Sequence, residues 1–133
     1  MLMDQERFHD SLERCQQNRE FLDAFYDRLL AVAPEIPSYF ANTDFRRQKH
    51  LLTMSFYDLL STAADKPEGH LHIQRLAEVH AQRKIPRALY DLWLDCLVET
   101  VAQYDPKFTP EIADAWREFM APCIKAMQAA APT

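Results

Sequence analysis

Apolar residues along this chain recur at intervals of three and four positions almost from end to end. This spacing places side chains on one face of an α-helix. No segment shows the apolar–polar alternation of a half-buried strand. Two clear examples of the helical spacing are the stripe Phe8, Leu12 and Cys15 and the stripe Leu89, Tyr90, Trp93, Leu97 and Val101. The pattern therefore predicts an all-α fold of six or seven helices.

Prolines and capping side chains indicate where several of these helices begin and end. Asp4 is a candidate N-cap for the first helix. The second helix should end near Pro34, because the residue before a proline resists helical geometry. Thr109 should cap the last helix, with Pro110 in its first position. Within that helix, Pro122 predicts a kink or an early stop.

Further segments complete the predicted order of elements. "PEIPSYF" predicts a short helical corner, and another helix should begin around residues 42–44, which offer capping side chains. A helix over about residues 70–83 should follow. Pro86 suits the first turn of the helix after it.

Gly69 is the only glycine, which narrows the classes of function. P-loops and dinucleotide-binding turns need several glycines for close approach to phosphate, so both are excluded. The net charge is −5, from 15 basic and 20 acidic residues, without a basic stripe. We therefore expect neither nucleic acid nor a membrane as a partner. The longest strong apolar run, "LLAVA", falls far short of the roughly 18 residues of a membrane span.

The length and the cysteines favour one cytoplasmic domain. A chain of 133 residues lies near the middle of the single-domain range, so we expect one domain over residues 1–133. The N-terminus is charged from its fourth residue and does not resemble a signal peptide. The three cysteines stand at apolar helical positions without a CxxC, which predicts buried, reduced thiols. They are Cys15, Cys96 and Cys123.

His80 interrupts the apolar pattern. It shares a helical face with Ile73 and Leu76, shortly before Arg83 and Pro86. On this local pattern alone, the ring could satisfy a carbonyl near the helix end, or its cation could favour the negative end of the helix. The other histidines form no zinc-type motif, and no Ser/His/Asp or Cys/His triad can be inferred. The segment by itself therefore favours a structural histidine.

Four stretches taken together change that interpretation. They are "AFYDRLLAVAPEIPSYF" at 24–40, "RQKHLL" at 47–52, "LAEVHAQRKIPRALY" at 76–90 and the later "AW" at 115–116. In order and spacing they resemble the globin family, and more narrowly bacterial single-domain globins and the haem domain of flavohaemoglobins. The resemblance covers almost the whole chain. It implies a globin fold of six to seven helices around a pocket for non-covalently bound haem b.

On the proximal side, the resemblance implies that His80 is the ligand to the haem iron. A neutral imidazole facing inward can coordinate iron, and its other nitrogen must then find an acceptor. Tyr90 matches a family tyrosine that contacts this histidine from the following helix. The alternative for Tyr90 is an ordinary core tyrosine on the Leu89 and Trp93 stripe.

On the distal side, the resemblance implies four further haem-site residues. Tyr26 matches the tyrosine whose hydroxyl donates to bound O2, and Gln48 matches a second donor. Leu52, one turn later, matches the apolar residue over the iron. Phe40 matches the phenylalanine that wedges against the porphyrin. The alternatives are core aromatics for Tyr26 and Phe40 and a solvated side chain for Gln48.

Two neighbours of Gln48 compete for the sixth position on the iron. His50 lies about 200° around the helix from Gln48, so it should face away from the pocket. Lys49 lies closer to the inner boundary, and we expect it to extend toward the haem propionates or solvent. Arg83 and Lys84 are candidate propionate partners, with a solvated helix end as the alternative.

The resemblance implies a protein that reversibly binds O2, NO or CO. NO dioxygenation is a further hypothesis, and the residues leave open whether the protein is an enzyme. No stretch indicates a flavin or nicotinamide domain, so electrons would come from a separate reductase. One alternative is a gas sensor that acts on a separate partner, which exposed apolar surface on the last two helices would favour. Another is a haem-free helical interaction domain.

Overall fold

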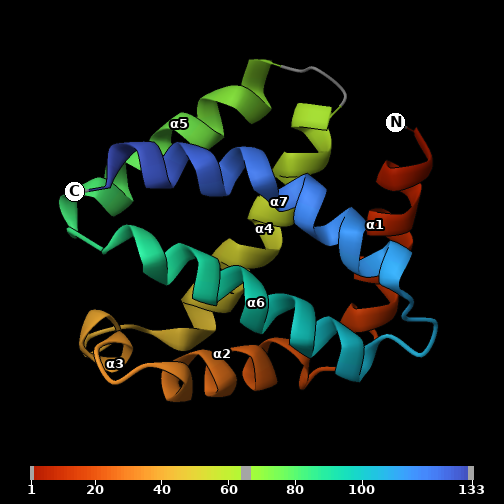
Figure 1. The fold of residues 1–133 in the computed structure, drawn as a ribbon, viewed down its shortest axis with the longest axis horizontal. Coiled ribbons are helices and arrows are strands. Elements are labelled where there is room, and N and C mark those ends of the chain that lie inside the picture. Colours follow the sequence, from red (N-terminus) through yellow and green to blue (C-terminus); the bar gives the residue numbers. More distant parts are fainter. Residues whose placement is uncertain (1, 64–66, 132–133) are drawn as a thin grey trace.

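The computed structural model describes residues 2–63 and 67–131, and within them the chain forms seven helices and no strand (Figure 1). This confirms the predicted all-α class. The helices are α1 (Leu2–Gln16), α2 (Phe21–Val32), α3 (Ile36–Tyr39), α4 (Phe45–Ala63), α5 (Pro67–Gln82), α6 (Arg87–Tyr104) and α7 (Pro110–Ala130).

The helices α6 and α7 pack against each other through the middle of the molecule. In the view of Figure 1, α2 lies below α6 and α5 lies above α7, and both pairs are in contact. α4 runs behind and packs on α5, while α1 closes one end against α7. The chain thus places α2, α4, α5 and α6, which carry five of the six predicted site residues, around one interior.

The core at the α1 end is built from large aromatic rings. The ring centroid of Trp116 lies 4.7 Å from that of Phe8 and 5.5 Å from that of Phe56, both edge to face. All three side chains are fully buried. Aromatic pairs of this geometry add to the stabilisation that comes from burying their large apolar surface. This end of the domain is therefore a packed core that holds α1, α4 and α7 together.

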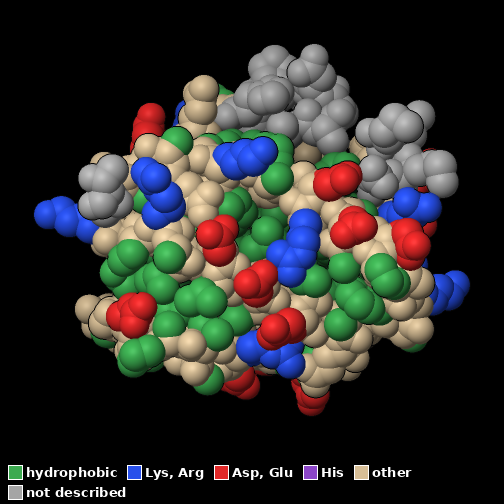
Figure 2. Space-filling view, in the orientation of Figure 1, with side chains coloured by type: hydrophobic (Ala, Val, Ile, Leu, Met, Phe, Trp, Pro, Cys, Tyr) green, Lys and Arg blue, Asp and Glu red, His purple; other side chains and the backbone are tan. Residues whose placement is uncertain are grey.

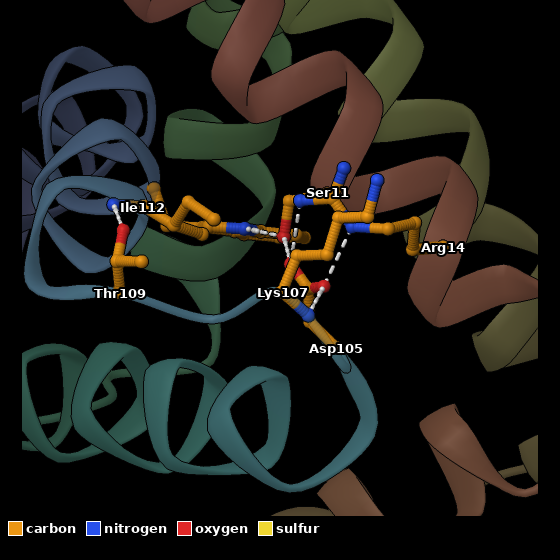
Figure 3. A network of polar contacts seen from close by, with 7 residues as sticks. Ser11, Arg14, Asp105, Lys107, Thr109 and Ile112 are labelled. Atoms are coloured by element: carbon orange, nitrogen blue, oxygen red, sulfur yellow. Dashed lines mark hydrogen bonds and ion pairs between the residues drawn. The ribbon is translucent and has the colours of Figure 1, made fainter.

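A buried polar network joins α1 to the corner between α6 and α7 (Figure 3). Asp105 accepts hydrogen bonds from Ser11 at 2.6 Å and from the backbone N–H of Lys107 at 2.9 Å, and it pairs with Arg14. Ser11 in turn accepts from the indole N–H of Trp116 at 2.9 Å. No sequence motif predicted this network, because its contacts join α1 to residues about ninety or more positions away along the chain.

Several predicted helix boundaries are confirmed. α2 ends at Val32, shortly before Pro34, and Thr109 caps α7 by accepting a hydrogen bond from the backbone N–H of Ile112 (Figure 3). The cap of α4 is Asp44, whose carboxylate accepts from two backbone N–H groups of the first turn. The expected corner in "PEIPSYF" is the short helix α3. The three cysteines are buried free thiols, as predicted.

Three boundary predictions are wrong. Asp4 lies inside α1, where an acidic residue in the first turn also suits the positive helix end, so it is not the N-cap. α5 begins at Pro67, earlier than the expected residue 70, with its proline in the first turn. Pro86 precedes α6 as its N-cap residue, one position before the first helical turn.

Pro122 does not stop α7, which continues to Ala130. A proline inside a helix removes one backbone hydrogen bond and crowds the preceding turn. Around it, however, Met120, Cys123 and Ile124 are all buried. Their burial on one side of the helix offsets the local cost and keeps this segment helical.

None of the described helices is both long and apolar enough to span a membrane.

Candidate functional site

His80 lies in the last turn of α5 and is half-buried. Its Nδ1 atom is 2.7 Å from the carbonyl oxygen of Leu76, one turn earlier. Because a carbonyl can only accept, Nδ1 carries the proton and donates, which leaves Nε2 with the lone pair of a neutral ring. Burial lowers the pKa of His80. The bond to Leu76 opposes this effect, and the positive charge of Arg83 adds to it. The site therefore favours the neutral imidazole that metal coordination requires.

Tyr90, on α6, is the aromatic neighbour of His80. The two ring centroids are 6.2 Å apart, with the planes at 62°. The Tyr90 hydroxyl is buried and has no hydrogen-bond partner in the described part of the chain. Burial raises the pKa of Tyr90 to about 12, with smaller contributions from Cys123 and Tyr39. At neutral pH it is a protonated phenol, able to donate.

Tyr26 and Gln48 are brought together from α2 and α4. Tyr26 is only 4% exposed, and the side chain of Gln48 lies near enough to its hydroxyl to act on its pKa. Burial raises the pKa of Tyr26 to about 12, and Gln48 acts in the opposite direction. Tyr26 is therefore also a neutral phenol at ordinary pH. Gln48 is half-buried, so it is not the fully solvated side chain of the alternative interpretation.

Leu52 and Phe40 provide apolar surface on the Tyr26 side. Leu52 is buried and lies one helical turn after Gln48 on α4. Phe40, at the end of α3, is half-buried, and its ring centroid lies 6.1 Å from that of Tyr26 in an edge-on arrangement. Both residues suit the wall of a pocket for an apolar group.

The sequence prediction omitted Phe45, the first residue of α4. Its ring centroid lies 5.4 Å from that of Tyr26 and 5.7 Å from that of Phe40. Its position three residues before Gln48 is the signal that could have identified it, because residues at this spacing share a helical face.

The six predicted residues thus form a proximal group and a distal group. His80 and Tyr90 come from α5 and α6, and Tyr26, Gln48, Leu52 and Phe40 come from α2, α4 and the end of α3. Among the described residues, no hydrogen bond or ring contact joins the two groups. Within each group, however, aromatic contacts connect residues from different helices, and Gln48 acts on the pKa of Tyr26.

The two basic neighbours of Gln48 that competed for the iron are directed elsewhere. Lys49 Nζ lies 2.6 Å from Asp23 Oδ1, in an ion pair that bridges α4 and α2. His50 is exposed, in agreement with its expected direction. Arg83 and Lys84 are exposed at the end of α5, where Lys84 adopts a φ of 57°. This left-handed conformation turns the chain out of the helix and is unusual for a residue other than glycine or asparagine.

A separate cavity of about 240 Å³ lies between α1 and α7 and contains none of the six predicted residues. Its lining mixes acidic and basic side chains with one apolar residue, Ile112. In the part of the chain that the structure describes, no three or more His, Cys, Asp or Glu residues gather as a metal site.

Comparison with known proteins gives one family and one closely matching structure. The family model described as Globin matches residues 23–127. The chain is also similar to a protein from Pseudomonas aeruginosa PAO1, whose crystal structure is described as structurally highly homologous to a human haemoglobin. The two chains are 33% identical over 98% of this chain and 99% of the other, with a TM-score of 0.88. No match was found among curated protein sequences.

Proposed function

This chain belongs to the globin family, and we propose on that premise that it holds haem b non-covalently through His80 and binds O2 reversibly, as well as NO and CO. Family and fold together support a haem globin that binds small gases. The haem type, the physiological gas and the six site residues are our proposal. We also propose that residues 1–133 form one globin domain, which the coverage of the solved structure supports.

The residues of the proximal group fit such a cofactor. The donation from His80 Nδ1 to the Leu76 carbonyl fixes the ring and leaves Nε2 available for iron. Burial keeps that imidazole neutral. A buried hydroxyl without a partner costs about 1–3 kcal/mol, so the Tyr90 hydroxyl also suits a place beside a further group. The His80–Leu76 hydrogen bond is the observation that carries the proposal.

When bound, haem supplies the iron that takes the gas. Tyr26 and Gln48 would then donate hydrogen bonds to the gas from the distal side. Because the pKa of Tyr26 is about 12, its hydroxyl keeps its proton throughout the neutral range. Gln48 lies beside the buried hydroxyl of Tyr26, so both donors would reach the gas from the same place. Leu52 and Phe40 would exclude water from the same side.

The direct test is a visible spectrum of the purified protein after reconstitution with haem. We expect a Soret band that shifts on addition of CO and of O2. A chain that takes up no haem under these conditions would contradict the proposal and favour a haem-free interaction domain. Steady consumption of NO in the presence of an external reductase would add the NO-detoxifying reaction to gas binding.

The surface gives little support to a gas sensor acting through a partner helix. Exposed large apolar side chains occur on α2, α4 and α5, and in the described residues none lies on α6 or α7; they are Val32, Leu51, Met54, Tyr57, Leu71 and Val79. On the face that Figure 2 shows, acidic and basic side chains are interspersed with apolar ones. Reversible gas binding is therefore the function that the chain supports best.

A further inference from the structure

Phe45 completes a cluster of three aromatic rings on the distal side. Its ring meets Tyr26 edge to face, with centroids 5.4 Å apart and an interplanar angle of 66°. It also stacks on Phe40 at 5.7 Å and 22°. Phe40 meets Tyr26 at 6.1 Å and 68°. Tyr26 is thus contacted by two stacked rings, and both contacts have the edge-to-face geometry that aromatic pairs prefer.

The position of Phe45 is itself well fixed. It is the first residue of α4, and the preceding Asp44 accepts hydrogen bonds at 3.1 Å and 3.3 Å from the backbone N–H groups of Arg46 and Arg47. This cap holds the first turn of the helix. Gln48 lies three residues after Phe45, on the same side of α4. One helical turn therefore both packs against the Tyr26 ring and carries Gln48, the side chain that acts on its hydroxyl.

We propose that Phe45 is a positioning residue, which holds the Tyr26 ring so that its hydroxyl is directed at the bound gas. This inference rests on the proposed function. Phe45 does not need to touch the gas. Its contribution is to remove alternative orientations of the Tyr26 ring that would carry the hydroxyl away from Gln48. Without Phe45, a smaller fraction of molecules would have the hydroxyl in place to donate.

The first experiment replaces Phe45 by leucine in the haem-loaded protein. The O2 dissociation rate, measured by stopped flow, should rise about 3- to 10-fold, which corresponds to the usual strength of one aromatic pair. In the CO complex, the infrared C–O stretching band should shift toward the band of a Tyr26→Phe variant, because that band responds to a nearby donor. Phe45→Trp keeps an aromatic ring, so its O2 dissociation rate and its CO band should both stay close to those of the wild type.

A double variant separates positioning from a direct effect on the gas. If Phe45 acts through Tyr26, Phe45→Leu should change the O2 dissociation rate less than 2-fold when Tyr26 is already phenylalanine. A full effect in that background would overturn the proposal, as would an unchanged rate and CO band in Phe45→Leu alone. If Phe45→Leu folds poorly, Phe45→Trp and Phe45→Met provide the same comparison between a ring and a flexible chain.

Phe119→Leu is the matched control. Phe119 is also half-buried and stacks on another phenylalanine, Phe8, at 4.9 Å and 9°, but it makes no ring contact with Tyr26. This variant should change stability without shifting the CO band. The outcomes also separate the two proposals. The proposed function is contradicted if the unmodified chain does not bind haem, or if Tyr26→Phe leaves the O2 dissociation rate unchanged. If Tyr26→Phe raises that rate and Phe45→Leu does not, only the role of Phe45 is contradicted.

Discussion

Arg14 and Asp105, 91 positions apart in the sequence, are joined at two points: Nε to Oδ1 at 2.6 Å and Nη2 to Oδ2 at 2.9 Å. The carboxylate side chain has no exposed surface, and that of Arg14 is 21% exposed. A buried carboxylate of this kind requires all its hydrogen bonds, since the interior cannot replace the water that it loses. The pair therefore fixes α1 to the corner between α6 and α7.

We predict that Asp105→Ala lowers the free energy of unfolding by about 3 kcal/mol, because it removes one partner of a buried charge pair and leaves Ser11 without its acceptor. Urea denaturation at pH 7 measures the change. The control is Asp95→Ala, whose ion pair with Arg117 at 3.0 Å is largely exposed and should contribute less than about 1 kcal/mol. Equal effects of the two variants would contradict a special role for the buried network.

Acid should weaken the same network. Burial alone would raise the pKa of Asp105, but hydrogen bonds from Arg14, Ser11 and the Lys107 backbone, together with the Arg14 charge, hold the pKa below the ordinary value of 3.8. A carboxyl group whose pKa is lowered by folding stabilises the fold fully above its unfolded pKa, and that contribution is lost as the pH falls through the folded pKa. The stability difference between wild type and Asp105→Ala should therefore be constant from about pH 5 to 7 and shrink below 3.8. Urea curves at stepwise lower pH measure this difference, and a constant difference down to pH 2 would argue against the ionised pair.

His80→Ala should abolish stable haem retention, because it removes the proposed ligand to the iron. The visible spectrum after reconstitution and gel filtration measures the retained haem, and added imidazole should restore part of the Soret band by replacing the missing ring. His72→Ala is the control, since His72 lies on the same helix but contacts Ser55 and Asp58 instead. A normal Soret band in His80→Ala without imidazole would refute the assignment of the ligand.

Local patterns in the sequence predicted the helices well, and long-range polar contacts poorly. The apolar spacing predicted the helices, and Thr109 and Asp44 act as caps because capping depends on neighbours only a few residues away. The continuation of α7 through Pro122 depends on burial by other helices, which no local rule contains. Asp105 lies in the stretch "YDPKFTP" between α6 and α7, and only the fold brings it to Arg14.

In the candidate site, too, local patterns predicted single residues but not the contacts between distant parts of the chain. Spacing alone placed His80 on an inward face, but the family resemblance was needed to connect it with Tyr26 and Gln48. Phe45 was overlooked because its contact with Tyr26 arises only when the fold brings the start of α4 against α2. The ion pair of Lys49 with Asp23 likewise depends on the fold.

Tyr26→Phe should accelerate O2 release by roughly 10- to 100-fold, because a hydrogen bond to a partly charged acceptor contributes about 1.5–3 kcal/mol. The substitution keeps the ring and its contacts with Phe40 and Phe45. Any change in the O2 dissociation rate is therefore due to the missing hydroxyl. Stopped-flow mixing of the oxygenated protein with excess CO measures the dissociation rate. Tyr57→Phe is the matched control, since its hydroxyl donates to Glu13 on α1 and its removal should leave the rate unchanged. If Tyr26→Phe released O2 at the wild-type rate, the Tyr26 hydroxyl would not be a donor to the gas, and Gln48 alone would have to account for any retention on the distal side.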